Sequence, residues 1–215
     1  MSNIPYVKSE TMEIVPEQQA AAEFAGLTKD FPQLTHLRAA VPVLLGTSIE
    51  AAESRPFGLR SQSTLSSAVP VGSSEVENVN SAFIVQSLTN GSTQLALCAT
   101  IIKGQPAGET LGEVFALRTT TGGQLDQVEE FTPEPTAEGK VVLRDGWWNR
   151  LTTCLSRENC GTTCLNAALT CPKVNWAVFL GCLAGRCGGC IVKCAACATC
   201  DCSFWCKFVA GCCNG

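Results

Sequence analysis

Histidine and charged residues are scarce in this sequence, and motifs for catalysis are missing. The 215 residues include one histidine, His36, and only 16% are Asp, Glu, Lys or Arg. A single histidine, without a nucleophile elbow, a phosphate-binding loop or a paired-carboxylate motif, gives no basis for a catalytic site. Basic residues nowhere form the dense stripe typical of nucleic-acid binding. We therefore predict that the chain is not an enzyme, binds no nucleic acid and uses His36 as an ordinary surface or helix residue.

The N-terminus also lacks a recognisable export signal. A signal peptide has a basic start and then an apolar stretch, but four charged residues interrupt the first twenty positions: Lys8, Glu10, Glu13 and Glu17. The longest candidate membrane segment is the uncharged run at residues 174–185. As a helix it would be about 18 Å long, against a hydrocarbon core of about 30 Å. This run alone is too short to span a bilayer.

Cysteine is nearly absent from the first 145 residues and abundant after them. Residues 1–145 contain only Cys98, whereas residues 146–215, the cysteine-rich tail, contain 14 of the 15 cysteines. Seventy residues bury too little apolar surface for comfortable stability, and each disulfide contributes about 2 to 4 kcal/mol. We predict that the tail is stapled by disulfides and holds no metal or other cofactor. The predicted disulfide cysteines are Cys154, Cys160, Cys164, Cys171, Cys182, Cys187, Cys190, Cys194, Cys197, Cys200, Cys202, Cys206, Cys212 and Cys213.

The net charge changes sign at the same position. The tail has six basic and two acidic residues, a net charge of +4, while residues 1–145 have nine basic and 17 acidic residues, a net charge of −8. Two segments of opposite charge attract each other until they are separated. The alternative is that both sets of charges are simply solvated.

Helix signals dominate the first 74 residues, which we interpret as a helical leader and flexible linker. Helix formers after Pro16 predict a first helix that ends near Gly26. A second amphipathic stretch covers residues 33–45 and is interrupted by Pro42. Serine, glycine and proline dominate residues 56–74, a composition that predicts a loop.

Short apolar runs separated by turn signals predict a small antiparallel β region over residues 75–131. Asn90-Gly91 is a strong hairpin signal. Cys98 falls within an apolar run and is expected to be a buried side chain. Residues 132–145 are rich in proline and charge, which predicts an exposed linker that a protease can cut.

Stop signals divide the tail, residues 146–215, into four or five short helices. Gly161 is expected to close the first helix, and Asn175 to cap one that the glycines at 185, 188 and 189 stop. Asp201 is expected to cap a last helix. The expected fold is α+β: a helical leader and a small antiparallel β meander, followed by a small disulfide-rich helical domain.

Thiolate metal binding is the main alternative for the tail. Three Cys-x-x-Cys spacings occur, at 187–190, 194–197 and 197–200, and a cytosolic protein would use such pairs for zinc or an iron-sulfur cluster. The tail has no histidine, and its earlier cysteines are spaced like helix stripes. Both features weigh against a metal site. Two alternatives to the internally stapled tail stay open: a cytosolic cysteine-thiolate metal binder, and a coat protein cross-linked by disulfides between chains.

Cationic and aromatic residues in the tail favour activity at a membrane surface. All four tryptophans lie there, and tryptophan settles at the membrane interface while basic residues are attracted to anionic lipid. Alternatively the rings fill a small core, above all those of Trp176 and Trp205. The predicted membrane-contact residues are Trp147, Trp148, Trp176, Trp205, Lys173, Arg186, Lys193 and Lys207.

The tail resembles the cysteine-rich bacteriocin precursors, particularly the halocin-type families. Residues 154–213 carry the resemblance, with Cys187-Gly-Gly-Cys190-Ile-Val-Lys-Cys194-Ala-Ala-Cys197 as the most suggestive stretch. The resemblance implies that the N-terminal region restrains the toxin and is removed. We therefore expect a secreted antimicrobial precursor, exported by a route that is not visible as a standard signal peptide. Its expected partners are a processing protease, the chain's own N-terminal pro-region, and a target-cell membrane or surface receptor.

Overall fold

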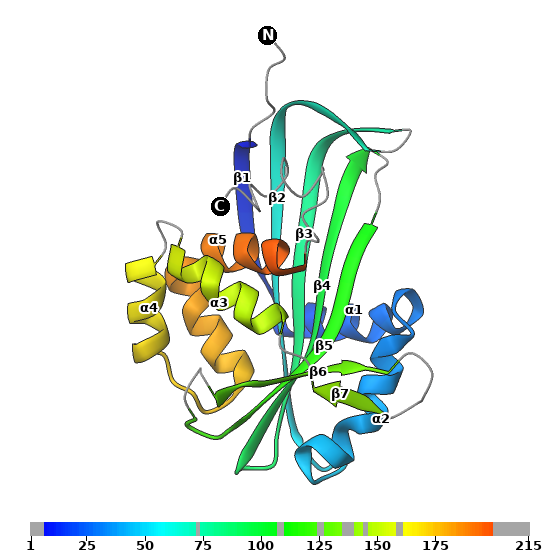
Figure 1. Cartoon of the computed structure of the whole chain (residues 1–215), viewed down its shortest axis with the longest axis vertical. Helices are drawn as coiled ribbons and strands as arrows, with labels where there is room; N and C mark the ends of the chain where they lie inside the picture. Colours follow the sequence, from blue (N-terminus) through cyan, green and yellow to red (C-terminus); the bar gives the residue numbers. More distant parts are fainter. Residues whose placement is uncertain are drawn as a thin grey trace.

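The computed structural model describes residues 7–71, 74–106, 110–123, 127–134, 140–143, 146–157 and 161–199. In this part of the chain it has seven strands and five helices (Figure 1). The strands are β1 (Val7–Val15), β2 (Glu53–Val71), β3 (Ser74–Thr89), β4 (Thr93–Pro106), β5 (Thr110–Thr120), β6 (Glu129–Pro133) and β7 (Val141–Leu143). The helices are α1 (Glu17–Asp30), α2 (Gln33–Leu45), α3 (Trp147–Arg157), α4 (Gly161–Thr170) and α5 (Trp176–Thr199).

The strands form one antiparallel sheet in sequence order, β1 to β7. Each inner strand pairs with the strand before it and the strand after it, and β1 and β7 form the two edges. Helices α1 and α2 lie between β1 and β2 in the sequence. After them the chain returns as β2, which pairs antiparallel with the edge strand β1. The fold is α+β, with a seven-stranded sheet and a helical C-terminal region.

Helices cover both faces of the sheet. On one face α1 and α2 pack against inward residues such as Leu88, Leu97 and Ala116. On the other face the helices of the tail pack against Phe83, Cys98 and other residues of alternate parity. Figure 1 shows the two helical layers on opposite sides of the strands. Because side chains alternate between faces, strands that are buried on both sides consist of unbroken apolar runs.

The hairpin predicted at Asn90-Gly91 is confirmed between β3 and β4. Gly91 has a positive φ of 92°, which glycine adopts without a steric cost. The Oδ1 of Asn90 accepts hydrogen bonds from the backbone N–H groups of Ser92 at 3.0 Å and Thr93 at 2.8 Å. Cys98 is fully buried in β4, also as predicted.

The loop predicted over residues 56–74 is wrong, because β2 occupies most of this stretch. Its serines and threonines lie in a strand that pairs with β1 on one side and β3 on the other; Gln62, for example, is opposite both Thr11 and Asn80. Backbone hydrogen bonds on both edges hold such a strand whatever its propensity. The sheet is consequently larger than the meander expected over residues 75–131.

Helix α2 covers the predicted residues but is not interrupted at Pro42, which lies inside it, and other helices differ from prediction at their ends. Helix α1 begins after Pro16 as predicted but continues past Gly26 to Asp30. In the tail, Asn175 caps α5, since its Oδ1 accepts a hydrogen bond from the N–H of Val178 at 2.9 Å. Gly161 does not close the preceding helix but begins α4.

Helix α5 runs through the glycines that were expected to stop it and reaches Thr199, with a kink at Cys187. Disulfides at Cys182, Cys187 and Cys194 anchor this helix along its length, and packing on the sheet offsets the low helix propensity of glycine. The last predicted helix, beginning at Asp201, lies outside the described residues.

The boundary expected at residue 146 is not a boundary in packing. The tail helices share a single apolar core with β2 to β5. The exposed linker predicted over residues 132–145 also includes part of β6 and all of β7. Residues 135–139 and 144–145 of that linker lie outside the described part of the chain.

Candidate functional site

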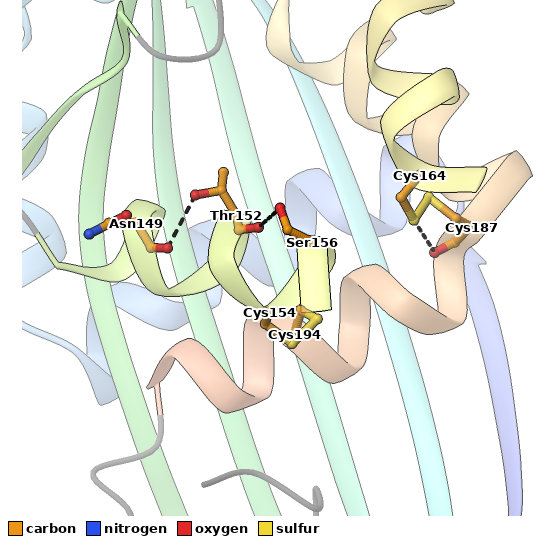
Figure 2. The surroundings of a disulfide bond; sticks show 7 residues. All are labelled: Asn149, Thr152, Cys154, Ser156, Cys164, Cys187 and Cys194. Carbon is orange, nitrogen blue, oxygen red and sulfur yellow. Dashed lines mark hydrogen bonds between the residues drawn. A yellow bond between two sulfur atoms is a disulfide. The ribbon is translucent and has the colours of Figure 1, made fainter. Parts of the chain in front are cut away.

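The candidate site is the interface between the sheet and the tail. It begins with the disulfides, which connect the tail helices to one another. Cys154 of α3 is bonded to Cys194 of α5, and Cys164 of α4 to Cys187 of α5 (Figure 2). A third bond joins Cys171, just after α4, to Cys182. The Cα atoms of the three pairs are 5.6, 5.7 and 5.8 Å apart. Helix α5 is thus the spine to which the other tail segments are attached.

Disulfide bonding of the described tail cysteines is confirmed, because Cys190 and Cys197 are also disulfide-bonded. The remaining predicted cysteines lie outside the described residues: Cys160, Cys200, Cys202, Cys206, Cys212 and Cys213. The described cysteines of the Cys-x-x-Cys spacings are used as disulfides, and no group of three potential metal ligands comes together in the described ranges.

No disulfide joins the tail to the sheet. Cys98 is the sole cysteine in the first 145 residues, and its thiol is free and buried. Burial raises the pKa of the Cys98 thiol well above its usual value, and the nearby charge of Glu130 raises it further. Apart from the polypeptide backbone itself, only non-covalent contacts hold the tail on the sheet.

Trp147, the first residue of α3, is the largest of these contacts. Its indole is fully buried between two rings of the sheet, with centroid distances of 4.3 Å to Phe115 and 5.4 Å to Phe83. Its Nε1 donates a hydrogen bond to the Oγ1 of Thr199 at 3.0 Å. The ring therefore connects the sheet to both ends of the tail's described helical layer.

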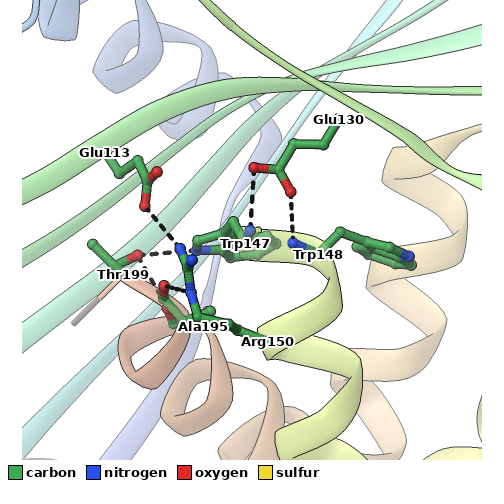
Figure 3. Close-up of polar contacts among 8 residues, drawn as sticks. Glu113, Glu130, Trp147, Trp148, Arg150, Ala195 and Thr199 are labelled. Atoms are coloured by element: carbon green, nitrogen blue, oxygen red, sulfur yellow. Dashed lines mark hydrogen bonds and ion pairs between the residues drawn. The ribbon is translucent and has the colours of Figure 1, made fainter. Parts of the chain in front are cut away.

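A buried carboxylate from the sheet caps the N-terminus of α3. Glu130 of β6 is 3% exposed, and its two oxygens accept hydrogen bonds from the backbone N–H groups of Trp147 at 3.1 Å and Trp148 at 2.8 Å (Figure 3). Helix N-termini have unpaired N–H groups and a partial positive charge, so a carboxylate is a favourable partner. Glu130 supplies a cap that α3 lacks in its own sequence.

Opposite charges meet beside this cap. The guanidinium of Arg150 on α3 lies 3.7 Å from the carboxylate of Glu113 on β5, and its Nε donates to the backbone oxygen of Ala198 at 2.7 Å. Figure 3 shows Arg150 between Glu113 and the end of α5. Glu113 and Glu130 belong to the acidic part of the chain, so the charge asymmetry of the sequence is used at this interface.

The outer edges of the interface are held by polar contacts and close approach. At one edge, the side-chain nitrogen of Gln94 donates to the backbone oxygen of Lys173 at 2.7 Å. At the other, β1 lies beside α5: a Cβ added at Gly188 would overlap the side chain of Met12. Partial burial raises the pKa of Glu10 on β1, and the charge of Lys193 on α5 offsets part of that shift.

A small apolar void remains at the centre of the interface. It has a volume of about 50 Å³ and is lined by Phe83, Ala96 and Cys98 from the sheet and by residues of all three tail helices. The void adjoins the cysteines at 164 and 187. The sheet and the tail helices therefore leave an apolar space between them at this point.

Few of the predicted membrane-contact residues are accessible in this fold. Trp147 and Trp176 are buried and Trp148 is half-buried, with its ring edge-on to that of Trp176 at 5.5 Å. Among the basic residues, Lys173 and Lys193 are half-buried and Arg186 is exposed, where it donates to the Oγ1 of Thr170 at 2.7 Å. Trp205 and Lys207 lie outside the described residues.

The opposite face of the sheet has a polar cleft of about 720 Å³ beside α1. Glu13 and Lys103 line it, together with the ion pair between Glu23 and Arg60. Its residue types form no recognised catalytic arrangement, and His36, on α2, does not line it.

The residues that sequence reasoning missed are Glu113 and Glu130. Their only signal was the net negative charge of residues 1–145, which indicates attraction without identifying the partners. No family model, curated protein or solved structure matches this chain.

Proposed function

We propose that the chain is a bacteriocin-like antimicrobial precursor. The acidic sheet region covers a cationic, disulfide-stapled tail. A protease cuts within residues 132–146, after secretion by a route without a standard signal peptide. The tail then attacks the membrane of a competing cell, either directly or through a surface receptor.

One observation carries this proposal: the tail is cross-linked internally, yet its apolar face is covered by the sheet. Trp147, Trp176 and Phe179 are all nearly inaccessible. Helix α5 is long and apolar enough, by length and composition alone, to cross a membrane, and half of its most apolar stretch is buried. A buried core helix can share these properties. Covering such a surface suits a precursor that must not act on its producer.

The competing functions have less support. A thiolate metal site would require free cysteines, but the described tail cysteines are in disulfides. A coat protein cross-linked between chains would require cysteines available for intermolecular bonds, whereas the three bonds with known partners are intramolecular.

The test is a full-length protein with a specific protease sequence inserted between Leu143 and Gly146, compared before and after cutting. The cut protein is expected to inhibit a panel of competing bacteria and archaea and to release dye from anionic vesicles, and the uncut protein to do neither. The matched control has a scrambled insertion of equal length and receives the same protease. Equal killing by cut and uncut protein would contradict the role of the sheet as a restraint, and no killing or leakage by either would contradict the antimicrobial function.

A further inference from the structure

Resting on the proposed function, we propose that cutting the chain does not release the tail, and that an anionic lipid surface does. The lipid bilayer replaces, one by one, the contacts that the sheet makes with the tail. The partner that activates the cut precursor is therefore the membrane itself.

The interface between the sheet and the tail does not depend on the linker that is cut. Its contacts come from several strands: the rings around Trp147, the Glu130 cap, the Glu113–Arg150 pair and the hydrogen bond from Gln94. None of them includes the linker between β7 and α3. A cut between residues 143 and 146 consequently leaves a non-covalent complex of sheet and tail.

An anionic bilayer offers a substitute for each kind of contact. Its apolar interior can receive the side chains of Phe179, Leu180 and Leu183, which now pack in the core shared with the sheet. Its phosphates can pair with Arg150 in place of Glu113 and can accept the N–H groups at the start of α3 in place of Glu130.

One polar group of the tail lacks a hydrogen-bond partner while the sheet covers it. The indole Nε1 of Trp176 is buried and has no hydrogen-bond partner among the described residues. A buried polar group without a partner has a free-energy cost that is removed when it finds an acceptor. At a membrane interface, tryptophan places its ring in an apolar layer and its N–H in a polar one. The central void of about 50 Å³ also represents packing that lipid contact can improve.

The opposite net charges of the two parts favour transfer of the tail, and not of the sheet region, to an anionic membrane. Residues 1–145 have a net charge of −8 and the tail has +4. A negatively charged surface attracts the tail and repels the sheet region within about a Debye length. The two parts are therefore pulled apart at an anionic bilayer and stay together near a neutral one.

The experiment uses the cut full-length protein and flotation of vesicles, either of phosphatidylcholine alone or of phosphatidylcholine with a quarter of phosphatidylglycerol. Without lipid, the two fragments are expected to co-elute in gel filtration at physiological salt. With anionic vesicles, the tail floats and the sheet fragment stays in solution, with at least tenfold more tail floated than with neutral vesicles.

A pair of variants makes the test specific for the interface. Glu130→Gln, which weakens the cap on α3, is expected to lower at least threefold the phosphatidylglycerol fraction needed for half-release. Glu17→Gln removes an exposed negative charge from α1, which packs on the opposite face of the sheet, and is expected to leave that fraction unchanged. If both variants lowered that fraction equally, the effect would come from net charge alone, and the proposed role of the Glu130 cap in holding the tail would be overturned.

Three outcomes separate this inference from the proposed function. Fragments that part without lipid, or that float together, overturn the inference, and the killing assay still decides the function. A tail that stays on the sheet in the presence of anionic vesicles, although the cut protein kills, also overturns the inference alone. Release by anionic vesicles at the composition that begins dye leakage supports both.

Discussion

The two faces of the sheet are covered by helices that are held in different ways. Helices α1 and α2 pack on one face through an apolar core that contains no cysteine from either helix. The tail helices pack on the other face and are also cross-linked to one another by disulfides. A layer that stays with the sheet needs no staples of its own. In the proposed function the tail leaves the sheet and loses the shared core, so its disulfides are what keep its helices together.

Removing the central ring of the interface is expected to have the largest effect. Trp147→Ala should lower the free energy of unfolding by about 3 to 5 kcal/mol, since it deletes a fully buried ring. In the cut protein it should also dissociate the tail from the sheet, measured by gel filtration. The matched change on the other face is Leu37→Ala, which should destabilise the fold by about 2 to 5 kcal/mol and leave the fragments associated. Dissociation in both variants would remove the distinction between the two faces.

Removing one staple is expected to have a slightly smaller effect. Replacing Cys154 and Cys194 together by alanine deletes a bond that closes 40 residues of sequence, at a cost of about 2 to 4 kcal/mol. The cost should appear in urea unfolding of the oxidised protein and disappear when both proteins are reduced. A difference that persists after reduction would assign the loss to packing instead of the cross-link.

The buried cap comes next. Glu130→Gln keeps the shape of the side chain but replaces one accepting oxygen with an amide group that faces an N–H donor, at a cost of about 1 to 3 kcal/mol. Urea unfolding of the uncut protein measures this cost. Glu129→Gln, on the adjacent residue, loses only an exposed ion pair with Arg118 and should cost less than about 1 kcal/mol. Equal losses would show that the cap on α3 contributes no special stability.

Filling the central void should strengthen the interface by about 1 kcal/mol. Ala96→Val adds two methyl groups next to the void, in a strand where valine is favoured. Ala99→Val, on the opposite face, adds the same groups at a fully buried position that lines no void described at the interface, and should cost about 1 to 3 kcal/mol. Thermal unfolding distinguishes the two signs, and a loss of stability in both variants would mean that the void is too narrow to fill.

The smallest expected effect concerns pH. The pKa of Glu10 is raised in the folded protein above its ordinary value of 4.5. The folded state then binds more protons than the unfolded state, so this contribution to stability is present below pH 4.5 and is lost as pH rises through the raised pKa. Glu10→Gln should make the urea midpoint less dependent on pH between pH 4.5 and the raised pKa. An unchanged pH profile would show that Glu10 is solvated as it is in the unfolded chain.

Local signals in the sequence predicted local structure well. Asn90-Gly91 specified a hairpin because few residues adopt the positive φ that the turn needs, and Asn175 specified the start of α5 because its side chain accepts an N–H. The disulfide staples followed from the cysteine content of a short segment. Each of these features depends on residues close together in the chain or on composition alone.

The larger errors arose where distant residues decide the outcome. Strand β2 contains many serines, and its pairing with two neighbours could not be read from its own propensities. Helix α5 passes through Gly185, Gly188 and Gly189 because disulfides and the sheet support it. Glu130 meets Trp147 across a stretch of 17 residues, and no pattern in the sequence links the two.

Buried Cys98 has a consequence for the chemistry of disulfide formation. A thiol must lose its proton to attack a disulfide, and the raised pKa keeps Cys98 protonated. It sits beside the void that also adjoins the cysteines of the 164–187 bond. An accessible thiolate at that position would catalyse exchange and scramble the pairings of the neighbouring helices. Because Cys98 is buried in β4, its thiol does not exchange with the disulfides of the tail while the tail stays on the sheet.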